Sequence, residues 1–531
     1  MTEVLLVATL AAPLALLVAC FRRDWRARAL ALQWLAPIPG LVAGLVGLRG
    51  APVALDLPAL GFTLRLDPPG ALLLAFAALL WIVVSAALWR GKAPDERFGL
   101  SWLLTMIGSL GVFIAGDIVS FYLLYALVSL PAYGLFAFSD NPEKKHAGAI
   151  YMAFAIAGEA VLLLAFALLA ADEIHGSVRI AEVMAALPSS PARGAIIALI
   201  VAGFGMKMGL IPFNGWMPLN YAAAPIPAAA ILSGAGVKAG VIGLIRFLPL
   251  GVPLAGWGEA LAALGFLTAF YGVAIGLTQQ NPKTILAYSS ISQMGVIAAA
   301  LGLGLATGDL SAAGDMAFYG ANHLLVKAAL FLTIGALAAR AAPLSGLTFV
   351  LAAALAYSLA GLPLTGGALA KLASKAQFVT GWPGFLAALS SIGSAMLMTH
   401  FLIRLAAPPA ETVDETPTDL VRFWPALALG ALVLPWFFAA HPFAALGFDK
   451  IWDGLWPIAT GAALLFGWRH SGIGVLDVPA GDIIGLYERG FARLLALGPG
   501  FETADDWLRQ WPAAGTAMLL IVLALLGAAS G

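Results

Sequence analysis

Apolar runs of roughly 20 residues, joined by short polar connections, make up most of this chain and restrict its fold more than any motif does. Hydrophobic residues account for 61% of the 531 residues and charged residues for only 11%, whereas a typical soluble domain has about 25% charged residues. A helix needs about 20 residues to cross the hydrocarbon core of a bilayer, and about sixteen runs qualify. We therefore expect an all-α polytopic membrane protein with about 14–16 transmembrane helices.

The expected spans cover the chain almost continuously, and barrel strands would instead be shorter and alternate in polarity. Their approximate ranges are 3–21, 29–48, 70–90, 99–116, 118–138, 148–171, 194–212, 225–248, 258–277, 284–304, 316–338, 344–380, 384–406, 421–440, 452–468 and 513–529. Three polar stretches remain between them. Residues 50–69 predict a hairpin, residues 172–192 an interfacial helix, and residues 471–511 an interrupted amphipathic helix.

Charge and cysteine content exclude several classes of function. Basic and acidic residues both number 28, so the basic surface that nucleic-acid binding requires is not expected. Cys20 is the only cysteine, which excludes an internal disulfide and a cysteine-ligated iron–sulfur cluster or zinc ribbon. The sequence shows no metal-ligand cluster, nucleophile triad or phosphate loop, so we expect no cofactor or metal and no covalent catalysis by this chain alone.

Basic residues concentrate in alternate connections, which indicates the orientation of the chain. By the positive-inside rule these connections face the cytoplasm, so we expect both termini on the outer side. The residues are Arg22, Arg23, Arg26, Arg28, Arg90, Lys92, Arg97, Lys144, Lys145, Lys283, Arg340, Arg404, Arg422 and Arg469.

Four lysines lie in or beside apolar runs, where a charged group costs free energy. Lys207, Lys238 and Lys327 lie in the middle of apolar runs, and Lys371 follows a Gly/Pro break in another run. Ionisable residues inside a membrane mark an ion path by default. His323 lies four residues before Lys327, hence on the same helix face, and an imidazole can accept and pass on a proton. The alternatives are a lysine paired structurally with a carboxylate, a lysine that snorkels to the interface, and a packed polar histidine.

Two spans are expected to be discontinuous. One carries Lys207 and runs into Pro212–Pro218; the other carries Gly361–Gly367 just before Lys371. Broken spans at corresponding positions of two halves are the best pointer from sequence to a transporter's binding site. Proton or cation transport is therefore the function that these residues favour.

Four motifs in this order carry a resemblance to a known family. They are WMPLNYAAAPIPAAAILSGAGVKAGVIGLIR (Trp216–Arg246), NPKTILAYSSISQMG (Asn281–Gly295), HLLVKAALF (His323–Phe331) and GLPLTGGALAK (Gly361–Lys371). Over roughly residues 50–440 the chain resembles the antiporter-like membrane subunits shared by respiratory complex I, Mrp cation/proton antiporters and membrane-bound hydrogenases.

The resemblance implies two inverted five-helix repeats, each a half-channel with a discontinuous helix. We expect a division into N-terminal helices with an external hairpin, a first repeat, a second repeat, and C-terminal helices with an amphipathic cytoplasmic segment. These parts are 1–98, 99–250, 251–406 and 407–531. The resemblance also implies the cytoplasmic membrane of a prokaryote and other membrane subunits as partners.

The same resemblance assigns a role to each buried cation. Lys207 is the central lysine of the first half, and Lys238 bridges the halves. His323 and Lys327 form the second central pair, and Lys371 is the terminal lysine from which the proton leaves toward the outer side.

Two departures from the family pattern bear on the first half. Ala126 stands where the family has the glutamate that pairs with Lys207, and Asn214 stands where the family has a histidine. Glu159 is the nearest candidate to replace that glutamate, and Asp117 is the other. Without a carboxylate partner, the first half would be silent.

The sequence thus predicts a proton- or cation-translocating subunit of a larger complex, coupled to a partner's redox reaction or to another ion's gradient. The predicted path is Glu159, Lys207, Lys238, His323, Lys327 and Lys371. Three alternatives stay open: an Mrp-type antiporter subunit, the membrane subunit of a proton-driven inorganic-carbon uptake complex with a zinc-containing partner, and a scaffold that has lost its pump. Whether the complex is an oxidoreductase with a peripheral redox partner also stays open.

Overall fold

The computed structural model describes residues 2–58, 61–89, 95–137, 141–172, 176–338, 346–378, 381–407 and 418–496, except 473, 475 and 477. The chain divides into two compact units, Met1–Ala480 and Gly481–Gly531. The second unit contains α21 (Ile484–Ala496), which occupies part of the stretch predicted as an amphipathic helix. The expected span 513–529 lies outside the described residues.

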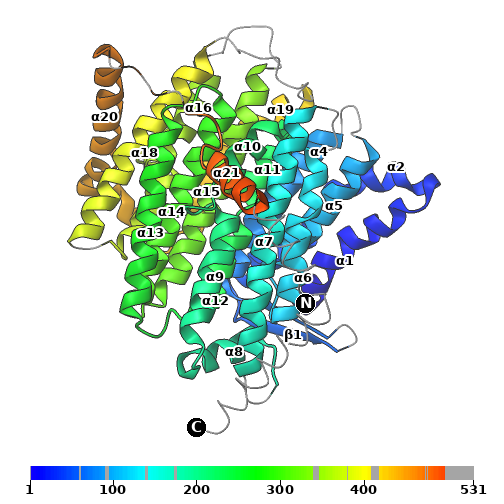
Figure 1. Ribbon diagram of the computed structural model, residues 1–531. Helices are drawn as coiled ribbons and strands as arrows, with labels where there is room; N and C mark the ends of the chain where they lie inside the picture. Colours follow the sequence, from blue (N-terminus) through cyan, green and yellow to red (C-terminus); the bar gives the residue numbers. More distant parts are fainter. Residues whose placement is uncertain are drawn as a thin grey trace. The chain divides into compact units, whose positions relative to one another are not determined.

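In the part of the first unit that the structure describes, the regular elements are helices and one hairpin, as predicted (Figure 1). Strands β1 (Val53–Leu57) and β2 (Phe62–Leu66) pair in antiparallel fashion, with Val53 opposite Leu66, which confirms the hairpin expected at residues 50–69. The helices before the first break are α1 (Thr2–Cys20), α2 (Arg23–Leu32), α3 (Ile38–Gly47), α4 (Pro68–Trp89), α5 (Glu96–Gly111), α6 (Ile118–Ser129), α7 (Pro142–Asp172), the short α8 (Ile180–Ala186) and α9 (Arg193–Met208).

Helices α10 to α20 complete the first unit. They are α10 (Trp216–Ala223), α11 (Ile226–Ile231), α12 (Lys238–Phe247), α13 (Ala255–Gly276), α14 (Pro282–Thr307), α15 (Ser311–Ala338), α16 (Gly346–Ser358), α17 (Gly366–Lys375), α18 (Trp382–Ala406), α19 (Thr418–Val433) and α20 (Phe448–His470). One π-helical turn, η4 (Leu232–Gly236), joins α11 to α12.

Within the described ranges, ten helical segments are long and apolar enough to cross a membrane. They are Thr2–Cys20, Arg23–Gly47, Pro68–Leu88, Ile118–Leu135, Pro142–Asp172, Ile226–Phe247, Ala255–Gly276, Pro282–Thr307, Ser311–Leu337 and Trp382–Ala406. Other expected spans occur as shorter helices, among them α5, α9, α16 and α19. The chain is therefore a multi-pass membrane protein.

Both predicted discontinuities are present. Helix α9 ends at Met208, and Gly209, whose φ is 72°, caps it before the connection to α10. Between α16 and α17, Gly361 and Leu364 have φ values of 95° and 64°, a region that favours glycine over other residues. Each break lies beside one predicted lysine, Lys207 or Lys371.

Small residues allow neighbouring helices of the first unit to pack closely. Helices α13 and α14 lie side by side (Figure 1), and a Cβ atom on Gly265 would lie 2.4 Å from the backbone nitrogen of Ala299. Such contacts let helix backbones approach within the bilayer. Every residue in an 18-residue window of the segment Ile226–Phe247 is buried, and Lys238 itself is fully buried, so Lys238 does not reach a lipid interface by snorkelling.

Candidate functional site

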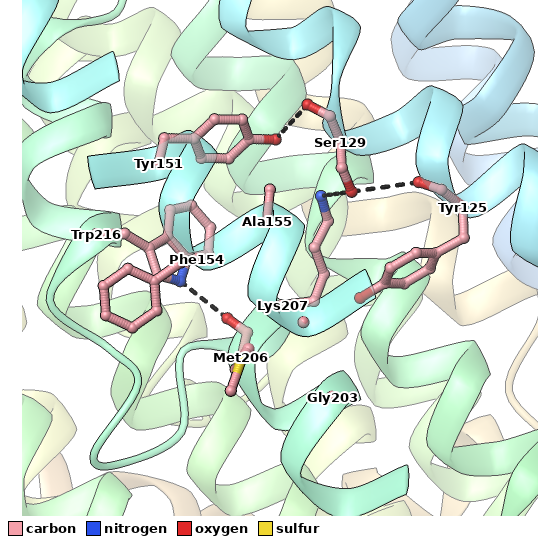
Figure 2. Close-up of a pocket in the computed structure, with 10 residues that line it drawn as sticks. Tyr125, Ser129, Tyr151, Phe154, Ala155, Gly203, Met206, Lys207 and Trp216 are labelled. Atoms are coloured by element: carbon pink, nitrogen blue, oxygen red, sulfur yellow. Dashed lines mark hydrogen bonds between the residues drawn. The ribbon is translucent and has the colours of Figure 1, made fainter. Parts of the chain in front are cut away.

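Lys207 lies in a buried pocket between α6, α7 and α9. Its Nζ donates a hydrogen bond of 2.9 Å to Oγ of Ser129, the last residue of α6. The rings of Tyr125 and Tyr151 lie 5.7 and 5.8 Å from the same nitrogen. Figure 2 shows the lysine side chain extending toward Ser129 between these two tyrosines. The pocket therefore surrounds one ammonium group with a hydroxyl and two aromatic rings, an arrangement that stabilises a cation.

Glu159 on α7 is the carboxylate that accompanies Lys207. It is buried, and it interacts with Lys207 through charge and with the Ser129 side chain. Its Oε1 has no hydrogen-bond partner among the described residues. Ser129 thus connects the two ionisable groups. It stands one helical turn after Ala126, the position where the family glutamate was expected.

Asp117, the other predicted substitute, is not available to Lys207. Its Oδ1 accepts from the backbone N–H of Ser120 at 2.7 Å, and its Oδ2 accepts from the backbone N–H of Thr63 at 2.6 Å. These bonds cap α6 and hold the β2 strand against it. Of the two candidate carboxylates, only Glu159 is placed to act with Lys207.

A small cavity of about 10 Å³ adjoins Lys207. Tyr151, Phe154 and Trp216 are among the residues that line it, and Nε1 of Trp216 donates 2.8 Å to the carbonyl oxygen of Met206 (Figure 2). This volume is close to the minimum that holds one water molecule. The first site therefore has room for at most a minimal water link.

Lys238 and His323 form the second cluster. Nζ of Lys238, at the start of α12, lies 2.8 Å from Nδ1 of His323 on α15 and 3.3 Å from the carbonyl oxygen of Ser233 in η4. Both side chains are fully buried. Nε2 of His323 has no hydrogen-bond partner among the described residues, so this ring nitrogen is available to a further proton donor or acceptor.

Lys327 belongs to the same cluster, one turn after His323 on α15. Its Nζ donates 2.7 Å to the carbonyl oxygen of Leu286 on α14, and it interacts with Lys238 through charge. The structure therefore brings Lys238, His323 and Lys327 together. Their role as proton carriers stays a prediction.

Lys371 lies at a third site, on α17. It is half-buried and donates to Oγ of Ser391 on α18. It lines a cavity of about 470 Å³, which is large enough for many water molecules. Lys375 is exposed and forms an ion pair with Asp453 of α20 at the same cavity.

Tyr319 and Gln293 connect the second and third sites, and the sequence reasoning missed both. The Tyr319 hydroxyl donates to Oε1 of Gln293, whose Nε2 donates 3.0 Å to Oγ of Ser394. Tyr319 lies one turn before His323 on α15, and both Tyr319 and Gln293 line the cavity that contains Lys371. The signal was present, because residues 319, 323 and 327 repeat every four positions along one helix face.

Lys207 and Lys238 share no direct hydrogen bond within the described part of the chain. Two amides, Asn214 and Asn220, lie between these lysines in sequence; they are fully buried, and neither amide has a side-chain hydrogen-bond partner among the described residues. Buried polar groups are normally satisfied by protein or ordered water. Two buried amides without side-chain partners are groups of the kind that ordered water satisfies.

Arg246, near the end of α12, has a structural role. Its guanidinium donates to the backbone carbonyls of Phe113 and Ala115 at 2.6 and 2.7 Å and pairs with Asp67 at 3.2 Å. Burial alone would raise the pKa of Asp67, but Arg246 and the backbone N–H of Gly70 hold it below its ordinary value. Arg246 thus anchors the start of α4 and the end of α5 to α12.

Metal binding finds no support in the described ranges, where no group of three His, Cys, Asp or Glu side chains is placed to hold an ion. The ionisable and hydroxyl groups described above are groups that can take up and release protons.

Comparison with known proteins gives a consistent picture. The sequence profile described as "NADH:quinone oxidoreductase/Mrp antiporter, TM" matches residues 115–397. NADH-quinone oxidoreductase subunit N of Desulforudis audaxviator is 32% identical over 59% of this chain and 66% of its own length. A protein of Rhizobium meliloti, named as a component of a probable K(+)/H(+) antiporter, is 29% identical over 71% of this chain and 40% of its own length.

The fold also matches a solved structure. The Mrp complex from Dietzia sp. DQ12-45-1b superposes with a TM-score of 0.75 over 100% of this chain and 63% of the matched chain, at 21% identity. An identity this low shows a shared fold only. The chain spans no more than 66% of the length of the two sequence relatives named above.

Proposed function

Because the chain belongs to the NADH:quinone oxidoreductase/Mrp antiporter transmembrane family, we propose that it translocates protons, or another small cation, as one membrane component of a larger complex. Its relatives are named as components of an NADH-quinone oxidoreductase and of a K(+)/H(+) antiporter. In this proposal, a partner's redox reaction drives the transport.

One observation carries the proposal: the 2.8 Å contact between Nζ of Lys238 and Nδ1 of His323, in a fully buried position. Two groups that both bind protons repel each other when both are charged, so placing them together without a carboxylate partner is costly. A pair that shares one proton avoids this cost. The contact therefore suits proton transfer between the two groups more than it contributes to the stability of the fold.

The proposed path follows the three sites in order. A proton enters at Glu159 and Lys207, crosses the buried amides Asn214 and Asn220, and reaches Lys238. From there the path reaches His323 and its neighbour Lys327, and it continues from His323 through the Tyr319 hydroxyl to Lys371. Water in the cavity of about 470 Å³ completes the last step.

Proton flux into sealed vesicles that contain the purified complex tests this function. Lys327→Ala and Lys371→Ala are each expected to reduce the flux at least about tenfold, because each removes a proton-binding group that no neighbour replaces. Lys145→Ala, at an exposed position near the start of α7, is the matched control. Unchanged flux in both Lys327→Ala and Lys371→Ala would contradict the proposed proton path.

The second candidate is a component of an Mrp-type cation/proton antiporter. The Rhizobium meliloti relative, named as part of a probable K(+)/H(+) antiporter, matches 71% of the chain, and this match supports the second candidate. An imposed sodium or potassium gradient should then drive proton flux without any electron donor. Flux that requires an electron donor instead favours the redox-coupled complex.

Partners and orientation belong to the same proposal. We expect other membrane subunits to co-purify in mild detergent, together with a peripheral redox protein or, for inorganic-carbon uptake, a zinc-containing protein. Both termini are proposed to face the outer side of the cytoplasmic membrane. Labelling of single cysteines introduced at Thr2 and Asp95, which should face opposite sides, tests the orientation.

A further inference from the structure

The cavity around Lys371 has one feature that the proposed path does not use. Helix α20 contributes a carboxylate to its wall, and α20 begins at Phe448, well beyond the family match that ends at residue 397. Among the described lining residues, Asp453 is the only carboxylate. It is therefore the one group in this wall that can accept a proton from an ammonium and still release it easily to water.

Close backbone contact fixes α20 against this site. A Cβ atom on Gly454 would lie 2.7 Å from the carbonyl oxygen of Gly361, in the break between α16 and α17. A Cβ atom on Gly361 would in turn lie 2.8 Å from Cδ of Lys371. Two successive close contacts thus connect the residue after Asp453 to the Lys371 side chain. The position of Asp453 beside the cavity is consequently set by packing and not only by its own charge.

Asp453 is also accessible at the surface of the chain. Its side chain is 39% exposed and that of its partner Lys375 is 49% exposed, whereas Lys371 is half-buried within the same cavity. Ion pairs this exposed contribute little to stability and exchange readily with water. The pair thus lies between half-buried Lys371 and the surface of the chain.

We propose that Asp453 is the acceptor through which protons leave Lys371. Lys375 is the positioning residue, because its ammonium pairs again with the Asp453 carboxylate once the proton has left. The Lys371 ammonium gives one proton through cavity water to the Asp453 carboxylate, leaving a neutral amine and a neutral acid. Asp453 then releases that proton to solvent and pairs again with the Lys375 ammonium, which stays charged throughout. No electron moves. This inference rests on the proposed function.

Proton flux in vesicles that carry the complete complex tests the proposal. Asp453→Asn cannot take up a proton and should lower the flux at least about tenfold, whereas Asp453→Glu should stay within about twofold of wild type. Asp56→Asn is the matched control, because Asp56 is also an exposed, ion-paired aspartate, with Arg179 as its partner, and neither residue lines the cavity. Wild-type flux in Asp453→Asn, or an equal loss in Asp56→Asn, would overturn the proposal.

Failure of this inference is distinguishable from failure of the proposed function. If Lys371→Ala loses flux and Asp453→Asn does not, only the exit through Asp453 is wrong; if neither loses flux, the relay itself is wrong. Infrared difference spectra supply a second measurement should Asp453→Asn fail to assemble. The carbonyl band of the transiently protonated acid must shift in Asp453→Glu, and an unmoved band would refute the assignment.

Discussion

Nζ of Lys238 on α12 lies 2.8 Å from Nδ1 of His323 on α15, and neither side chain is exposed to solvent. A lysine ammonium only donates hydrogen bonds, so with Lys238 charged, Nδ1 accepts and a neutral His323 carries its proton on Nε2. That Nε2 atom has no hydrogen-bond partner among the described residues. Transfer of the Lys238 proton to Nδ1 would therefore load the imidazole and leave Nε2–H free to pass a proton onward.

Substituting arginine for Lys238 should distinguish a role of its positive charge from a role in proton transfer. A guanidinium keeps the positive charge but does not lose its proton in proteins. Lys238→Arg is therefore expected to lose flux at least about tenfold, as far as Lys238→Met does. Vesicle proton flux is the measurement, with the exposed Lys145→Arg as control. If Lys238→Arg transports as well as wild type, charge alone suffices and the shared-proton account is wrong.

A carboxylate introduced at position 126 should restore proton flux to a first site that lacks Glu159. Glu159→Gln removes the acid beside Lys207, and we expect flux to fall at least about tenfold. Adding Ala126→Glu, one turn before Ser129, places an acid where the family resemblance predicts one and should restore a measurable part of that flux. Ala126→Glu alone should change flux less than about twofold, since Glu159 is already present.

The outcome for Ala126→Glu alone also tests the scaffold alternative. A chain that has lost its pump would show no flux until the acid is introduced at position 126. Appearance of flux only in that variant would support the scaffold and contradict the role given to Glu159.

The sequence predicted the helices, the hairpin and both breaks, because each leaves a local pattern of hydropathy, proline or glycine. The shared face of His323 and Lys327 followed from their spacing of four. Partners on other helices left no such pattern. Ser129 lies 78 residues from Lys207, and Asp453 lies 78 residues from Lys375, so only the packed fold reveals either contact.

The two candidate acids for the first site have different surroundings in the fold. Asp117 and Glu159 were both eligible from their types and their neighbouring spans. Asp117 is the N-cap of α6, and its carboxylate accepts a hydrogen bond from the first turn of that helix, as an aspartate before a helix commonly does. Glu159 has no such role. That signal was readable, and an acid that caps a helix has less weight as a relay candidate.

Acid stability should report on the Asp67–Arg246 pair. The pKa of Asp67 is lower in the folded protein than its ordinary value, so its contribution to stability is complete above about pH 4 and lost as pH falls through the folded pKa. Asp67→Asn should cost about 1–3 kcal/mol near neutrality, and this difference should shrink below about pH 4. Melting temperatures of the detergent-solubilised protein across this pH range measure it.

The exposed Asp56, which pairs with Arg179 at 2.5 Å, provides the control for that measurement. A pair this exposed is worth about 0–1 kcal/mol, so Asp56→Asn should change the melting temperature little at any pH. Equal losses in Asp56→Asn and Asp67→Asn would contradict the anchoring role of Arg246.

Removal of a single hydroxyl tests the connection between the second and third sites. Tyr319→Phe keeps the ring but deletes the group that donates to Gln293, and this hydroxyl lies on the face of α15 between His323 and the cavity of Lys371. We expect flux to fall at least about tenfold with little change in melting temperature. Tyr357→Phe is the matched control, because the Tyr357 hydroxyl bonds to Thr399 at 3.0 Å and does not line the cavity. Full flux in Tyr319→Phe would show that protons reach Lys371 through water alone, without this hydroxyl.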